Sequence, residues 1–152
     1  MRFLKTLALL ALGSWAGATS CVLTAQNVAL TTAYLWTDAA PTTLVVTPGT
    51  VTCTLDGTAV TAHARLDGSP SVRALYEGGA PGGPALRYSL LVGSQRWGDG
   101  TAGSVTFPLV LSGLVGDVQS FPLTATLTLP AGQLVPAGLY RGTLNITLDF
   151  DP

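Results

Sequence analysis

The chain has 152 residues and a formal net charge of −1, a size that is typical of a single domain. Hydrophobic residues make up 47% of it and charged residues only 10%, which excludes a disordered chain and disfavours a helical bundle or a coiled coil. The seven basic residues are spread along the chain, so the charge pattern also excludes a nucleic-acid-binding surface.

Residues 1–18 have the parts of a secretory signal peptide. Arg2 and Lys5 supply the positive start, an apolar run follows, and a stretch of small residues ends at Ala18. The apolar run is too short to cross a bilayer as a helix, and no later segment reaches that length. We therefore expect cleavage after Ala18, export of a domain formed by residues 19–152, and no membrane span.

Cys21 and Cys53 are the only cysteines of the chain. In an exported protein an even number of cysteines favours a disulfide, and two residues allow one intramolecular pairing. An alternative is that Cys21 becomes a lipidated N-terminus, as in bacterial lipoproteins. The residues before Cys21 match such a site poorly, and lipidation would leave Cys53 without a partner. We predict the Cys21–Cys53 bridge.

Apolar and polar residues alternate with a period of two along the mature chain, which predicts strands. The parity of the apolar residues changes near Gln26-Asn27, so the first strand is expected to break there. The strongest hairpin signal joins residues 50–55 to residues 60–66 through a tight turn at Asp56-Gly57. Further strands are predicted at residues 71–76, 86–92, 104–111, 120–129 and 143–150. Seven or eight short strands with no helical segment predict a single all-β sandwich.

Candidate sites for chemistry are few. Residues 98–103 fit the pattern G-x-G-x-x-G, but they lead into a predicted strand rather than a helix, so we interpret them as a turn. His63 lies on the polar face of its strand, and we expect it to face solvent. Catalysis would need a nucleophile and an orienting acid beside it, and the sequence has no G-x-S-x-G motif. We predict no catalytic, cofactor-binding or metal-binding residue. An alternative function is a self-contained secreted carbohydrate-binding sandwich, in which exposed aromatic residues stack on sugar rings; the candidates are Tyr34, Trp36, Tyr76, Tyr88, Trp97 and Tyr140.

Several short stretches, in this order along the chain, resemble the spore coat protein U domain, the pilin domain of archaic chaperone–usher systems. The similar stretches are Cys21, residues 51–55 around Cys53, residues 86–91, the Trp-Gly-Asp-Gly run at 97–100, and residues 129–133 and 137–140. One departure is Arg141-Gly142, where the family commonly has a small residue followed by Asp.

The resemblance implies an incomplete immunoglobulin-like β-sandwich that lacks one strand. A periplasmic chaperone would fill the resulting groove first, and at the outer-membrane usher a strand from a neighbouring pilin subunit would replace it. The groove would be lined by the apolar row of the last predicted strand: Leu144, Ile146, Leu148 and Phe150. The implied function is a non-enzymatic structural or adhesive pilus subunit at the cell surface, supporting attachment and biofilm formation, without a cofactor.

The predicted cleavage site adds an expectation about position in the pilus. Shaft subunits of this kind carry a donor strand before the first cysteine, whereas only Thr19 and Ser20 would precede Cys21 here. A subunit that accepts a strand without giving one belongs at the end of a linear polymer. We therefore expect a tip-like role, with a surface or glycan receptor that the sequence does not identify.

Overall fold

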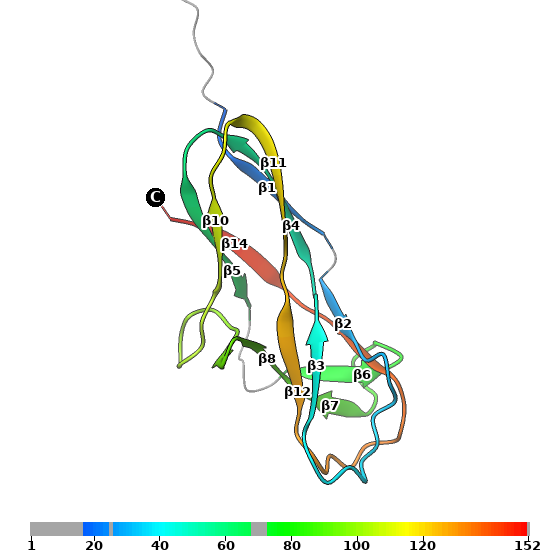
Figure 1. Ribbon diagram of the computed structural model, residues 1–152. Helices are drawn as coiled ribbons and strands as arrows, with labels where there is room; N and C mark the ends of the chain where they lie inside the picture. Colours follow the sequence, from blue (N-terminus) through cyan, green and yellow to red (C-terminus); the bar gives the residue numbers. More distant parts are fainter. Residues whose placement is uncertain (1–16, 25, 68–72, 152) are drawn as a thin grey trace, which may run out of the picture.

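The computed structural model describes residues 17–24, 26–67 and 73–151, which form antiparallel sheets and no helix (Figure 1). The predicted all-β fold is confirmed. Residues 1–16 of the predicted signal peptide lie outside the described residues. Within the described part, no helix has the length and hydropathy needed to cross a membrane.

Two long stretches of chain form the centre of the first layer. In one, β3 (Thr42–Val46) leads into β4 (Thr50–Asp56); in the other, β11 (Val115–Pro122) leads into β12 (Ala125–Leu129), and the two stretches pair with each other. The two sheets of this layer contain, in spatial order, β1 (Ser20–Thr24), β4 (Thr50–Asp56) and β11 (Val115–Pro122), and then β3 (Thr42–Val46), β12 (Ala125–Leu129), β8 (Ser89–Val92) and β9 (Gln95–Arg96).

The second layer is built in the same way around β13 and β14, which follow one another in the chain. Its two sheets contain, in spatial order, β10 (Phe107–Leu111), β5 (Val60–Leu66) and β14 (Ile146–Phe150), and then β2 (Asn27–Ala29), β13 (Tyr140–Thr143), β6 (Ala74–Glu77) and β7 (Ala85–Arg87). β10 contains Pro108 and is an edge strand, a position in a sheet where proline is tolerated.

The inward side chains of both layers form one hydrophobic core. Burial alternates along the strands with the predicted period of two: in β4 the side chains of Val51, Cys53 and Leu55 are buried, and those between them are more exposed. Trp97 is the largest fully buried side chain, and its Nε1–H donates to the carbonyl oxygen of Ala64 at 2.8 Å. The core therefore also satisfies its bulkiest polar group.

The first strand changes layers partway along its length. β1 pairs with β4 in the first layer, whereas β2 pairs with β13 in the second. The break predicted near Gln26-Asn27 is thus confirmed. Because of this switch, the first strand pairs with β13 and not with β14, which follows β13 in the chain.

The predicted hairpin between residues 50–55 and 60–66 is wrong. β4 and β5 form as strands, but they lie in different layers and pair with different neighbours. Gly57 has the expected positive φ of 90°, whereas Asp56 does not; its carboxylate instead accepts a hydrogen bond from the Thr58 N–H at 2.9 Å. Both strands have one apolar face, and across the core these faces can cover each other.

Other boundaries also differ from the prediction. β3 at Thr42–Val46 was not predicted. β10 begins at Phe107 rather than at residue 104, because the Ser104 hydroxyl closes the preceding turn by donating to the Thr101 carbonyl oxygen at 2.7 Å. The predicted strand 86–92 is split between the layers at Tyr88.

A tyrosine corner fixes the entry into β13. The Tyr140 hydroxyl donates to the carbonyl oxygen of Pro136 at 2.7 Å, four residues upstream, as in immunoglobulin-like sandwiches. The nearby loop at Tyr34 is joined to it, since the Tyr34 N–H donates to the Gly138 carbonyl oxygen at 2.9 Å. The departure at Arg141 therefore does not disturb the corner.

Tyr88 gives the fold a dependence on alkaline pH. Burial raises the pKa of its hydroxyl to about 12, although the nearby Arg73 cation opposes the shift. In the unfolded chain the hydroxyl titrates at about 10, so its contribution to stability is complete below about pH 10 and is lost as the pH rises toward 12. We expect Tyr88→Phe to remove up to about 3 kcal/mol of alkaline destabilisation, measured by urea unfolding between pH 8 and about 12. Equal pH slopes for the variant and the parent would contradict this.

Candidate functional site

One edge of β14 has no partner strand among the described residues, because β14 ends its sheet and pairs only with β5. The hydrogen bonds at the two ends of this pairing show which residues of β14 bond to β5. The Asp67 N–H donates to the Asn145 carbonyl oxygen and the Asp151 N–H donates to the Thr61 carbonyl oxygen, both at 2.9 Å. The odd-numbered residues of β14 therefore bond to β5, and the even-numbered ones direct their N–H and C=O groups to the open edge.

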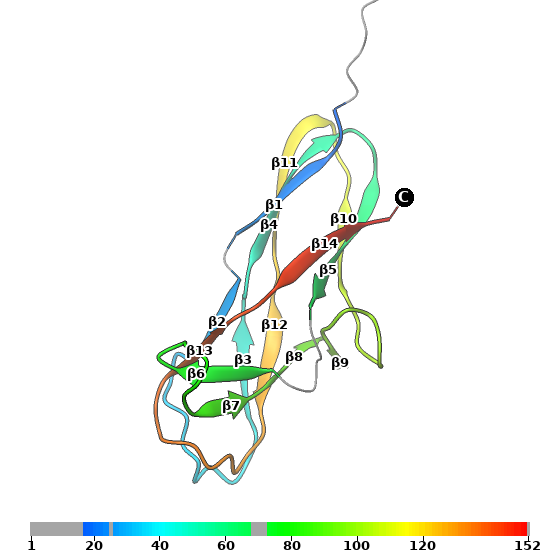
Figure 2. The same cartoon turned by 180° about the vertical axis from the view of Figure 1, so that it is seen from behind.

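β1 is the corresponding edge of the first layer. It pairs with β4 on one side and ends its sheet on the other. Figure 2 shows that β2 and β13 lie side by side and that, beyond them, β1 and β14 diverge from each other. This side of the sandwich is therefore closed where β2 pairs with β13, and it has an opening between β1 and β14.

The inward side chains of β13–β14 become more exposed along this opening. Leu144 and Ile146 are 5% and 8% exposed, Leu148 is half-buried, and Phe150 is 43% exposed. The row predicted from sequence therefore lies on one face, but only its second half borders the opening. On β1, the inward residue Leu23 is also only half-buried. Apolar surface is left uncovered on both sides of the gap.

The predicted disulfide between Cys21 and Cys53 is present. The two residues are directly opposite each other in the β1–β4 pairing, and Cys53 is fully buried while Cys21 is half-buried. The bridge therefore fastens β1, which has a neighbour on one side only, to the interior of the sandwich.

A cleft of about 230 Å³ lies at the upper end of the gap, where β1 begins and β14 ends. Its lining includes Val60 and the exposed ring of Phe150, together with Thr19, Asp56 and Thr58. The Thr58 backbone N–H and the Thr19 hydroxyl bond to the Asp56 carboxylate and hold its pKa below the usual value. The opening thus has an apolar interior and one fixed carboxylate at its rim.

At the lower end of the gap, Gln26 contacts the open edge of β14. Its backbone carbonyl oxygen accepts from the Leu144 N–H at 2.7 Å, and its side-chain Oε1 accepts from the Ile146 N–H at 2.9 Å. Sequence reasoning identified Gln26 only as a place where the strand breaks. The available signal was a polar side chain at the change of parity.

The outer face of β14 is polar and is bound to β5. The contacts are Thr147 Oγ1 to Asp67 Oδ2 at 2.8 Å, Arg65 Nη1 to Asp149 Oδ2 at 3.2 Å, and His63 Nε2 to Asp151 Oδ2 at 3.0 Å. His63 was expected to face solvent, and it is half-buried between Asp151 and the Thr106 hydroxyl. These contacts fix β14 in register while its other edge is open.

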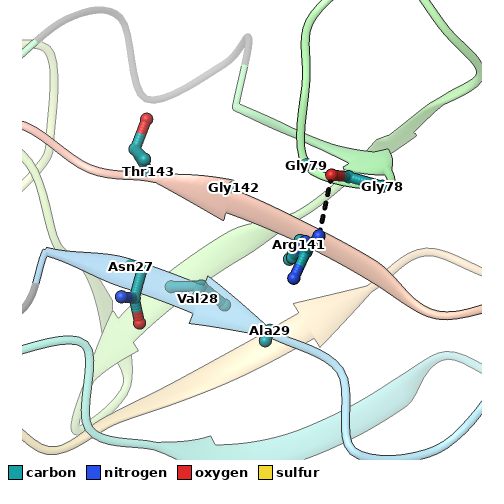
Figure 3. A pocket seen from close by; sticks show the side chains of 8 residues that line it. All are labelled: Asn27, Val28, Ala29, Gly78, Gly79, Arg141, Gly142 and Thr143. Carbon is teal, nitrogen blue, oxygen red and sulfur yellow. Dashed lines mark hydrogen bonds between the residues drawn. The ribbon is translucent and has the colours of Figure 1, made fainter.

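A second cleft of about 380 Å³ lies over the outer face of β2 and β13 (Figure 3). The Arg141 guanidinium crosses it and donates to the Gly78 carbonyl oxygen at 3.0 Å. A Cβ at Gly79 would lie 2.8 Å from Arg141 Nε, so glycine leaves room for this side chain. Asn27 and Thr143 supply the remaining polar side chains. Arg141 here acts as a tie between β13 and the β6–β7 turn.

The other sequence candidates have structural roles. Residues 98–103 form the predicted turn, in which the Asp99 carboxylate accepts from the Thr101 N–H and hydroxyl. Of the six aromatic candidates for sugar stacking, Trp36 is 51% exposed and Tyr76 is half-buried; the other four, Tyr34, Tyr88, Trp97 and Tyr140, are buried. Within the described ranges, no group of three or more His, Cys, Asp or Glu residues could hold a metal ion.

No curated protein and no solved structure matches the chain. The family described as Spore Coat Protein U domain matches residues 7–147, and this family is associated with chaperone–usher pilus-type subunits. The matched stretch contains both cysteines, β1 and β13 and reaches into β14, so the chain belongs to the Spore Coat Protein U domain family.

Proposed function

We propose that this chain is a non-enzymatic pilus subunit that is completed by a strand of another protein inserted between β1 and β14. The observation that carries the proposal is the open edge of β14, which has no neighbouring strand among the described residues and lies beside apolar side chains that become more exposed toward Phe150. An exposed edge of this kind is prone to aggregation unless a partner covers it.

An inserted strand would satisfy both kinds of group. Its backbone would pair with the even-numbered residues of β14, and alternate side chains would cover Leu148, Phe150 and Leu23. The outer face of β14 is already engaged by β5 through Arg65 and His63, so the partner needs to supply only the inner contacts. Family membership supports a periplasmic chaperone as the first occupant, and a neighbouring subunit as the next at the outer-membrane usher.

The terminal position in the pilus is part of the proposal. With cleavage after Ala18, Thr19 would begin the mature chain, and its nitrogen lies 3.2 Å from Asp56 Oδ2. The new α-ammonium would pair with this carboxylate, so the short segment before Cys21 would be held against β4 of its own subunit. Such a segment would give no strand to a neighbour, which is the property of a tip subunit.

The carbohydrate-binding alternative has less support, because four of its six aromatic candidates are buried. It also predicts a different behaviour in solution. A complete sandwich would be stable without a partner and indifferent to an added strand.

A donor-linked chain tests the proposal. Residues 19–152 are followed by a short flexible linker and a ten-residue strand that alternates valine and threonine; linkage raises the effective concentration of the strand to the millimolar range. The matched control carries the same ten residues in an order in which valine and threonine no longer alternate. We expect the alternating strand to raise the free energy of unfolding by about 3 kcal/mol or more by burying apolar surface, and the control to have little effect. Equal stability of the unlinked chain and both linked chains would overturn the proposal.

A further inference from the structure

The side chain of Gln26 takes the place of a missing backbone group at the inner end of the opening. β2 and β13 pair in a regular antiparallel register, with Gly142 opposite Val28 and Thr143 opposite Asn27. The hydrogen bond from the Leu144 N–H to the Gln26 carbonyl oxygen extends this ladder by one residue, at 2.7 Å. Beyond Gln26 the first strand leaves for the other layer.

The next N–H group on the open edge belongs to Ile146. In a continued ladder it would bond to the carbonyl of Thr24, but Thr24 pairs with Thr50 in the first layer. Gln26 Oε1 accepts from the Ile146 N–H instead, at 2.9 Å. Ile146 is only 8% exposed, so its N–H would be costly to leave without a partner.

The chain uses a glutamine amide in the same way elsewhere. Gln133 Oε1 accepts from the Arg87 N–H at 2.7 Å, and Gln133 Nε2 donates to the Arg87 carbonyl oxygen at 2.8 Å. There the amide reproduces both hydrogen bonds that a neighbouring strand would make with β7. Gln26 reproduces the acceptor half of this pattern on β14.

We propose that Gln26 is a place-holder: it caps the Ile146 N–H while the opening is vacant, and an inserted strand displaces its Oε1 with a backbone carbonyl oxygen. This inference rests on the proposed function. The Gln26 side chain is at the surface, so it can swing into solvent while its backbone bond to Leu144 is kept. Strand uptake then competes with an internal hydrogen bond at one defined position.

Two substitutions separate this role from a general effect on packing. Gln26→Leu has a similar size and no acceptor, whereas Gln26→Glu keeps an oxygen that can accept from the Ile146 N–H. Both are made in the unlinked chain and in the donor-linked chain. Amide hydrogen exchange at Ile146, followed by NMR, reports directly on the capped group.

In the unlinked chain, we expect Ile146 to exchange about fivefold faster in Gln26→Leu than in the parent, and Gln26→Glu to restore the slow exchange. In the donor-linked chain all three should exchange equally slowly, because the strand now supplies the acceptor. The equilibrium constant for uptake of the linked strand should be about fivefold larger in Gln26→Leu, since no bond is displaced.

Unchanged Ile146 exchange in unlinked Gln26→Leu would show that Gln26 does not cap this group and would overturn the inference. The inference would also be overturned if the exchange rate of Ile146 still depended on residue 26 in the linked chain. Gln26 Oε1 would then keep its bond to the Ile146 N–H and would not be displaced by the strand. A linked strand that fails to stabilise even the parent is a different result: it refutes the proposed function and the displacement, while the unlinked chains still decide whether Gln26 caps Ile146.

Discussion

Replacing Cys21 and Cys53 together by alanine is expected to lower the free energy of unfolding by about 4 kcal/mol and to release β1 from the sandwich. The bridge joins residues 32 positions apart, and the loss of loop-closure entropy for a loop of this length gives that magnitude. β1 has β4 as its only neighbour among the described strands. Once the covalent link is absent, five residues paired on one side hold it poorly.

Chemical denaturation of the double alanine variant measures the loss, and reduction of the parent protein provides an independent comparison without a change of side chain. Val22→Ala is a matched control on the same strand, because Val22 is exposed and faces away from the core. The donor-linked chain should lose less than the unlinked one, since the added strand gives β1 a second neighbour. A loss below about 1 kcal/mol in the unlinked chain would mean that β1 is held by its ladder and packing alone.

Alternation along the strands predicted which side chains are buried but not which strands are neighbours. Val51, Cys53 and Leu55 share one face by their spacing, and all three are buried, because a period of two specifies a face. The same pattern said nothing about the partner of that face, and the short link after Asp56 suggested a hairpin where the chain crosses between layers. Thr42–Val46 was missed because Leu44 and Val46 give it only two apolar positions of the expected parity.

The candidate site was predictable only in part for the same reason. The apolar row from Leu144 to Phe150 was visible in the sequence, and its place at a groove came from the family resemblance. The hydrogen bond of Gln26 to Ile146 joins residues 120 positions apart and depends on the register of β2 against β13. No local pattern carries this information. What the sequence does contain is the break in parity that makes the bond necessary.

Leu148→Asp is expected to abolish uptake of the inserted strand while the vacant chain still folds. Leu148 is half-buried beside the opening, so in the vacant chain an aspartate there can still reach water. An inserted strand would cover that carboxylate with apolar side chains, and burial of an unpaired charge costs several kcal/mol. The equilibrium constant for uptake of the linked strand should therefore fall by about 100-fold or more, measured as the difference in unfolding free energy between linked and unlinked chains.

Val22→Asp is the matched control, because it places the same charge on the other strand that borders the opening but on its 63% exposed outer face. It should leave uptake of the linked strand close to the parent value. Together the two variants locate the added strand. A strand that lies between the layers is weakened by a charge on the inward face of β14 and is not affected by a charge on the outward face of β1. If Leu148→Asp lowered the stability of the linked and unlinked chains equally, the added strand would not lie on Leu148, and the covered edge would have to be sought elsewhere on the sandwich.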